Sequence, residues 1–137
     1  MRRVFVDTLF LVGMWNPVDQ HNSSAKRSWK VVRGSELVTT DAVLIEVLNA
    51  FSSFKRPWRE IIAQSIEIVL SETRISVVRL SSELFHESLL LYKSRRDKTY
   101  SFTDCISMIV MRQERIKDVL SSDHHFEQEG FTLLMKA

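Results

Sequence analysis

Short apolar runs alternate along this chain with longer segments whose apolar residues recur at helical spacing. The short runs are rich in β-branched and aromatic residues, which predicts strands, and the longer segments predict helices. We expect strands within residues 3–7, 36–39, 74–80, 116–123 and 130–134. We expect helices within residues 8–15, 19–32, 40–51, 57–70, 82–92, 101–111 and 124–127. Because strands and helices alternate, the pattern predicts an α/β sandwich with a mainly parallel central sheet.

Composition narrows the class of protein. The 137 residues suffice for one domain, spanning residues 1–137, and a hydrophobic share of 45% is typical of a soluble globular protein. No apolar run approaches the ~20 residues that a membrane-spanning helix needs, so we expect no membrane attachment. The only cysteine, Cys105, excludes an intramolecular disulfide and agrees with a reducing, cytoplasmic location. The net charge of +2 is too small to identify a polyanionic partner.

The segment of residues 100–111 predicts the start of a buried helix that contains a single carboxylate, Asp104. A buried carboxylate is costly unless it is paired, hydrogen-bonded or bound to a metal. A second interpretation is available, because Ser101-x-x-Asp104 has the form of a capping box with Asp in place of the usual Glu or Gln. This segment alone leaves both interpretations open.

Three further acids lie in settings like that of Asp104. Asp7 and Asp123 each follow a predicted strand, and open α/β sheets bind ligands at the carboxyl ends of their strands. Glu46 lies among aliphatic residues within a predicted helix, where helical spacing brings Asn49 close enough to hold it by a hydrogen bond. Each acid also has an ordinary interpretation. Asp7 and Asp123 would be helix N-caps, and Glu46 would reach solvent from the edge of its helix.

If the fold brings these four carboxylates together, they repel one another and raise the pKa of at least one of them. A divalent cation would offset that repulsion. Carboxylate oxygens suit Mg²⁺ or Mn²⁺, whereas a zinc site would use a set of cysteine and histidine ligands that this chain lacks. His124 and His125 are neighbours in a predicted helix and should point apart, so we do not expect both to bind one ion. Such a metal site polarises a phosphoryl oxygen and orients an attacking water.

Four short motifs carry a resemblance to a known family. They are Val6-Asp7-Thr8, the stretch from Thr40 to Glu46 with Leu48, Ser101-Phe102-Thr103-Asp104, and Ser122-Asp123-His124-His125-Phe126 with Gly130-Phe131. In this order and at these spacings they resemble the PIN-domain ribonucleases, and among them the small VapC-type toxins of toxin–antitoxin pairs. The resemblance covers essentially the whole chain. It implies a PIN-like three-layer α/β/α sandwich with about five strands in a short, mainly parallel sheet.

The resemblance also implies an activity, which is metal-dependent endonucleolytic cleavage of RNA by a water that Mg²⁺ or Mn²⁺ activates. The acids that match the family's four acidic positions, and are the expected catalytic residues, are Asp7, Glu46, Asp104 and Asp123. Asp7 and Asp104 would be the main metal ligands, while the other two acids help to hold the metal or position water. The polar side chains expected beside the acids are Thr8, Asn49, Ser101 and Thr103. Leu9 departs from the family, which often has a small hydroxyl residue at that position.

Partners follow from the same resemblance: an RNA substrate, a second copy in a homodimer, and a small VapB-type antitoxin. Such antitoxins lay a helix and an extended tail over a hydrophobic groove. The candidates for that groove, with ordinary core packing as the alternative, are Met14, Trp15, Phe51, Phe54 and Trp58. The candidates for contacts with the RNA backbone are Arg95, Arg96 and Arg112. Two alternatives stay open, namely a PIN-fold module that binds RNA or protein without cutting and an RNA-processing nuclease that is not a toxin.

Overall fold

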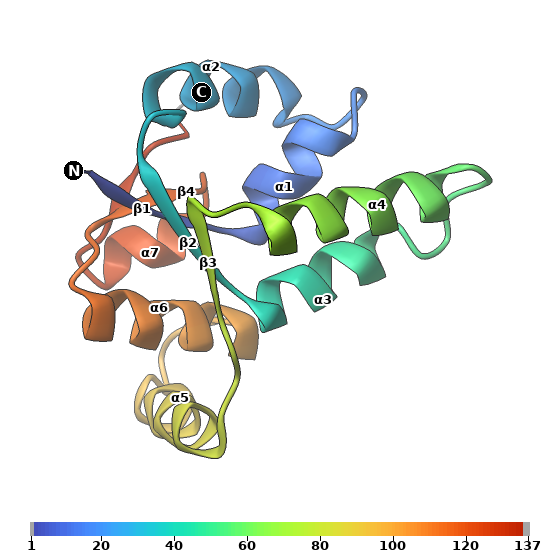
Figure 1. Cartoon of the computed structure of the whole chain (residues 1–137). Coiled ribbons are helices and arrows are strands. Elements are labelled where there is room, and N and C mark those ends of the chain that lie inside the picture. Colours follow the sequence, from blue (N-terminus) through green and yellow to red (C-terminus); the bar gives the residue numbers. More distant parts are fainter. Residues whose placement is uncertain (1, 136–137) are drawn as a thin grey trace.

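The computed structural model describes residues 2–135, which form a central sheet flanked by helices (Figure 1). The strands are β1 (Arg3–Val6), β2 (Glu36–Thr40), β3 (Ile75–Val78), β4 (Asp118–Leu120) and β5 (Thr132–Leu133). The helices are α1 (Thr8–Trp15), α2 (Asn22–Val32), α3 (Asp41–Ala50), α4 (Trp58–Ser71), α5 (Ser82–Ser94), α6 (Phe102–Glu114) and α7 (His124–Gln128). Every predicted element is present, although the last three strands are shorter than the apolar runs that predicted them.

The sheet has the strand order β3-β2-β1-β4-β5, and every neighbouring pair of strands is parallel. Val4, Phe5 and Val6 of the central strand β1 are all buried. Burial of consecutive residues is expected of a parallel strand that helices cover on both faces. The predicted α/β sandwich with a parallel sheet of five strands is confirmed.

The strand order places β1 beside β4 at the point where the chain changes direction across the sheet. From β1 the chain runs outward through β2 to β3, and then it crosses back to β4 and β5. The loops that leave the carboxyl ends of two such strands diverge, and open α/β sheets bind their ligands in the crevice between them. Asp7 follows β1 directly, and residues 121–123 follow β4, so this crevice is bordered by polar side chains.

Helices lie on opposite sides of the sheet, with α2 above it and α5 and α6 below it in Figure 1. Helix α6 is the buried helix that the apolar pattern predicted, and its buried apolar residues are Cys105, Ile106, Met108, Val110 and Met111. Among residues 2–135, no helix is both long enough and apolar enough to cross a membrane.

Side-chain caps fix the starts of α3 and α6. Thr40 Oγ1 accepts a 3.1 Å hydrogen bond from the Val43 amide at the start of α3, so Thr40 is the N-cap of this helix. Ser101 caps α6 in the same way. At its other end α6 stops at Arg115, whose φ of 57° is left-handed and turns the chain toward β4.

Candidate active site

Four carboxylates line one pocket of about 320 Å³ at the carboxyl edge of the sheet. They come from four separate places: the end of β1, helix α3, the first turn of α6 and the start of α7. The residues that line the pocket are Asp7, Thr8, Leu9, Glu46, Thr99, Ser101, Asp104, Asp123 and His125. The fold therefore brings together all four acids that the sequence singled out.

Asp7 is buried, with only 4% of its surface exposed. It occupies the N-cap position of α1, but its side chain makes no capping hydrogen bond, so the N-cap interpretation of this carboxylate is wrong. Its Oδ2 atom instead accepts a 2.7 Å hydrogen bond from the hydroxyl of Ser121, beyond the end of β4. Burial raises the pKa of Asp7 to about 7, with smaller upward contributions from Asp104 and Asp123, while the bond from Ser121 opposes the shift.

Asp104 fulfils both interpretations that the sequence left open. Its amide donates a 3.0 Å hydrogen bond to Ser101 Oγ, and its Oδ2 atom accepts a 3.1 Å bond from the Ser101 amide, which completes a capping box. The same carboxylate lines the acidic pocket and is 9% exposed. Burial raises the pKa of Asp104 and the charge of Asp123 adds to the shift, while bonds from Ser101 and His125 oppose it. The capping box thus holds a pocket carboxylate in one orientation.

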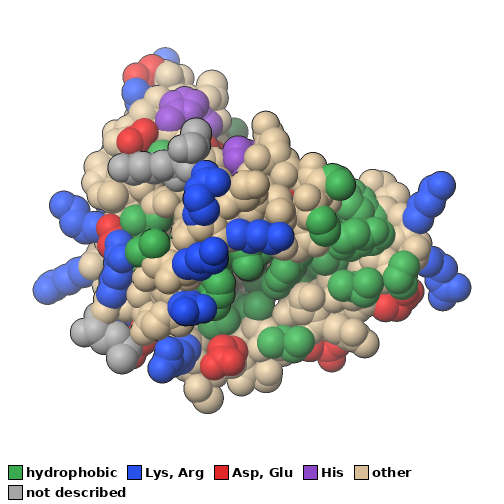
Figure 2. Space-filling model, turned by 90° about the horizontal axis from the view of Figure 1, so that it is seen from above, with side chains coloured by type: hydrophobic (Ala, Val, Ile, Leu, Met, Phe, Trp, Pro, Cys, Tyr) green, Lys and Arg blue, Asp and Glu red, His purple; other side chains and the backbone are tan. Residues whose placement is uncertain are grey.

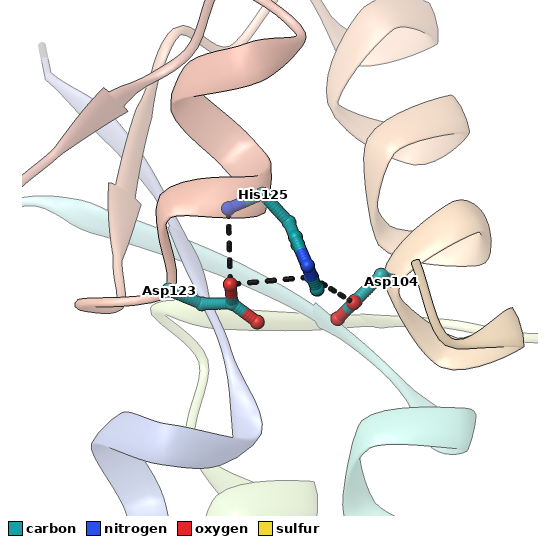
Figure 3. A group of neighbouring side chains, drawn as sticks. All are labelled: Asp104, Asp123 and His125. Carbon is teal, nitrogen blue, oxygen red and sulfur yellow. Dashed lines mark hydrogen bonds and ion pairs between the residues drawn. The ribbon is translucent and has the colours of Figure 1, made fainter. Parts of the chain in front are cut away.

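Asp123 and His125 complete the group from the side of α7 (Figure 3). Asp123 caps this helix, because its Oδ1 atom accepts a 3.0 Å hydrogen bond from the His125 amide. The Nδ1 atom of His125 lies 3.2 Å from Asp104 Oδ2 and 3.3 Å from Asp123 Oδ1. Since an ionised carboxylate only accepts hydrogen bonds, Nδ1 donates. In the neutral ring Nε2 then accepts from the Thr99 hydroxyl, 3.0 Å away.

Only some of the other predicted site residues line the pocket. Glu46 is half-buried and lines it, but Asn49 is exposed, and no hydrogen bond joins the two side chains in the described part of the chain. The structure therefore does not support the predicted link between them. Ser101 and Thr8 line the pocket, whereas Thr103 does not. The hydroxyl of Thr8 is buried, and it has no hydrogen-bond partner among residues 2–135.

Known proteins share both this sequence and this fold. The family model of the PIN domain matches residues 4–131. The chain belongs to the PIN domain family. The 23S rRNA-specific endonuclease VapC20 of Mycobacterium tuberculosis is 27% identical over 128 residues, which make up 93% of this chain and 95% of that protein.

Solved structures agree with the assignment to the PIN domain. The crystal structure of Mycobacterium tuberculosis VapC20, described as a Sarcin-Ricin loop cleaving toxin, matches with a TM-score of 0.83 at 25% identity over 94% of this chain and 96% of that chain. The structure of VapBC2 from Rickettsia felis, bound to a DNA fragment from their promoter, matches with a TM-score of 0.69 at 16% identity over 96% of each chain, which is a likeness of fold. The predicted family, fold and class of enzyme, a metal-dependent endonuclease, are confirmed.

The donor atoms in the pocket of this PIN domain fit a divalent cation. Ligand atoms of Asp104, Asp123 and His125, one from each, all lie within 4.8 Å of one another. Asp7 adds a further carboxylate. Its raised pKa indicates that the pocket, without a cation, disfavours the ionised form of this side chain. A cation would reverse that preference, and carboxylate oxygens are the ligands that Mg²⁺ and Mn²⁺ favour. His125, whose Nδ1 lies against the Asp104 and Asp123 carboxylates, belongs to this group beside the oxygen ligands that the sequence predicted, and His124 does not.

Two of the three arginines predicted to contact RNA are bound to a buried acid instead. Glu129, whose side chain is 5% exposed, accepts hydrogen bonds from Arg95 Nε at 2.8 Å, from the Tyr100 hydroxyl at 2.8 Å and from Arg112. The bond from Arg95 is the main reason why the pKa of Glu129 falls to about 2. The third arginine, Arg96, is exposed. No sequence signal marked Glu129, because its partners come from segments that only the fold brings together.

An apolar pocket of about 290 Å³ lies between α1, α2, α4 and the sheet. Its lining residues are Val6, Phe10, Leu11, Met14, Trp15, Trp29, Leu37, Thr39, Ser65, Ile68, Val69 and Ile75. Met14 and Trp15 belong to it, as predicted for the groove. Phe51, Phe54 and Trp58 do not line this pocket and pack against one another in a separate aromatic cluster, as in the core-packing alternative. Figure 2 shows hydrophobic side chains gathered beside lysine and arginine side chains on the face that α2 occupies.

Proposed function

We propose that this PIN domain is an endoribonuclease whose divalent cation, Mg²⁺ or Mn²⁺, is bound by Asp7 and Asp104 with help from Asp123. The observation that carries the proposal is the convergence of four carboxylates from four elements on one pocket at the switch point of the sheet. When bound there, the cation would polarise a phosphoryl oxygen of the substrate and orient an attacking water.

The side chains of the chain itself have distinct tasks in this proposal. Ser121 orients the Asp7 carboxylate, and the capping box orients that of Asp104, so both ligands are placed before the substrate arrives. Glu46 lines the pocket and, among residues 2–135, makes no hydrogen bond or ion pair. Its carboxylate is therefore available to accept a proton from a water in the pocket. His125 holds the carboxylates of Asp104 and Asp123 together.

A loop of a structured RNA is the substrate that we infer. The relative VapC20 is named for its action on 23S rRNA, and its crystal structure is described as that of a Sarcin-Ricin loop cleaving toxin. Proteins recognise RNA in loops because unstacked bases and the backbone are accessible there. The acidic pocket is open at the end of the sheet, where a loop can enter.

The role of a toxin controlled by an antitoxin is the second part of the proposal. The apolar pocket beside α1 and α4 has the lining expected of a groove that takes apolar side chains from an antitoxin helix. A homodimer is supported by exposed apolar side chains on two helices that both pack against α6. They are Ile45 and Leu48 on α3 and Phe85, Leu89 and Leu90 on α5.

The deciding experiment is incubation of the purified chain with a pool of total RNA, which includes ribosomal RNA, in Mg²⁺, Mn²⁺ or EDTA. We expect discrete cleavage with either metal and none in EDTA. Asp104→Asn keeps the shape of the side chain but removes the charged ligand, so cleavage should be lost. Glu67→Gln, which removes one exposed carboxylate on α4, is the matched control and should cut like the natural sequence. Equal cleavage by the Asp104→Asn variant would contradict the site. Calorimetry that detects no metal binding would favour a module that binds without cutting.

A further inference from the structure

A second pocket adjoins the acidic pocket, between the end of α5 and the start of α6. Its volume of about 700 Å³ lies within the ~300–1,000 Å³ that ligand sites commonly occupy. Its lining residues are Leu89, Tyr92, Lys93, Arg95, Arg96, Lys98, Thr99 and Tyr100. Thr99 lines both pockets, and its hydroxyl lies 3.0 Å from His125 Nε2. The two pockets therefore share a wall.

The charge of this second pocket is opposite to that of the acidic one. Its four cationic side chains are Lys93, Arg95, Arg96 and Lys98, and no carboxylate is part of its lining. Arg95 forms an ion pair with Glu129, and the Nζ atom of Lys98 lies 3.5 Å from Asp97 Oδ2. Among residues 2–135, no ion pair engages Lys93 or Arg96. These two side chains are exposed, so their charges are available to an anion.

An aromatic ring stands beside these charges. Tyr92 lines the pocket and is 52% exposed. The ring packs against Phe102 at a centroid distance of 6.0 Å in a T-shaped contact, which restricts its orientation. A partly exposed ring whose orientation is restricted is the usual platform on which proteins stack an unpaired base.

We propose that this second pocket binds a nucleotide of the RNA next to the bond that is cut. Tyr92 stacks on its base, and Lys93 and Arg96 contact its flanking phosphates. The inference rests on the proposed ribonuclease function and adds the subsite that positions the strand. Because Thr99 borders both pockets, a strand whose scissile phosphate lies at the acids has its neighbouring nucleotide over the basic lining.

The first test measures binding in EDTA, where cleavage does not occur, with a fluorescein-labelled single-stranded RNA of mixed sequence. Lys93→Ala combined with Arg96→Ala is compared with Lys30→Ala combined with Arg33→Ala. The control removes the same charge from exposed positions at the other end of the molecule, on and just after α2 (Figure 1). We expect only the first variant to bind weakly. The slope of log affinity against log salt should fall by about 1.4, since each phosphate contact on a single strand contributes about 0.7.

The second test concerns the ring. Tyr92→Leu keeps an apolar side chain but loses the stacking surface, so RNA affinity should fall at least ~5-fold, in line with the ~1–3 kcal/mol that stacking of one base contributes. Tyr92→Phe keeps the ring and should bind like the natural sequence. Thermal unfolding of each variant checks that α5 and α6 remain packed.

The outcomes separate this subsite from the nuclease activity. Binding by the Lys93 and Arg96 double variant with the same affinity and salt slope as the natural sequence would overturn the subsite, even if metal-dependent cleavage is found. Weakened RNA binding by that double variant and by Tyr92→Leu, together with normal RNA binding by Tyr92→Phe, would establish the subsite even in a chain that does not cleave RNA. Equal loss of affinity in the α2 control would show a general charge effect, which also overturns the proposal.

Discussion

The hydroxyl of Ser121 donates a 2.7 Å hydrogen bond to the buried carboxylate of Asp7. The same hydroxyl oxygen accepts a 3.0 Å bond from the Asp123 amide. Ser121 therefore joins two acids of the pocket across the gap between β1 and β4, and it is itself fully buried. A bond from a hydroxyl to a buried carboxylate favours the charged form, which is the form that binds a cation.

Ser121→Ala should therefore weaken the site without unfolding the protein. Loss of this hydrogen bond removes an influence that lowers the pKa of Asp7, so Asp7 will hold its proton to a higher pH. We expect the acid limb of the pH–activity profile to move up by about one to two pH units, given ~1.5–3 kcal/mol for a hydrogen bond to a charged group. Cleavage rates between pH 5 and pH 9 measure the shift. Ser122→Ala, at the next position, should leave the profile in place.

Asp7→Asn should stabilise the protein in buffer without metal. The folded chain holds the Asp7 proton up to a pH of about 7, because its pKa is raised from 3.8, whereas the unfolded chain releases it near 3.8. The free energy of unfolding therefore falls as pH rises between these values. Asparagine does not titrate, so the variant should gain up to about 4 kcal/mol at pH 8 and almost nothing at pH 4. Urea unfolding in EDTA at both pH values measures the difference, and a destabilised variant at pH 8 would contradict the prediction.

Glu129→Gln should have the opposite effect on stability. The pKa of Glu129 falls from 4.5 to about 2 in the folded chain, so its contribution is present above pH 4.5 and is lost as pH drops toward 2. Removing its charge leaves Arg95 and Arg112 without their partner, and we expect a loss of about 3 kcal/mol at pH 7. Urea unfolding at pH 7 and pH 2.5 tests this. Glu127→Gln, an exposed change on α7 two residues before Glu129, should cost almost nothing.

Glu46→Gln should reduce the rate of cleavage far more than Asn49→Ala. Glu46 lines the pocket and is assigned the task of accepting a proton, which is typically worth ~10²–10⁴ in rate. Asn49 is exposed on the same helix and does not line the pocket. Single-turnover cleavage of RNA in Mn²⁺ compares the two variants. Similar losses in both would assign Glu46 a structural role instead.

Much of this site could be predicted because its acids follow rules of position. Asp7 and Asp123 come directly after β1 and shortly after β4, and parallel strands present such residues at one edge of the sheet. Asp104 follows the capping-box pattern, which fixed its place at the start of α6. The sequence pattern did not reveal that one carboxylate, Asp104, can both cap α6 and line the pocket. That depends on which residues from other elements lie opposite the first turn of α6.

The parts that sequence reasoning missed depend on contacts across the fold. Nothing in the sequence marks Ser121 as a partner of Asp7, because only the pairing of β1 with β4 places the two side chains together. The expectation that His124 and His125 would not share one site did not indicate which of them lies at the acids, and the cap by Asp123 turns His125 toward Asp104. The spacing Asp-x-His at a helix start was an available signal for that turn. Glu129 had none, since Arg95, Tyr100 and Arg112 approach it from other segments.

The strand order has a consequence for a ribosome that is making this chain. The central strand β1 is synthesised first, but its neighbour β4 is added only after β2, β3 and six intervening helices, α1 to α6. Until β4 inserts, Asp7 lacks Ser121, and the pocket lacks Asp123 and His125. An unfinished nascent chain therefore lacks the complete acidic pocket until synthesis is nearly over.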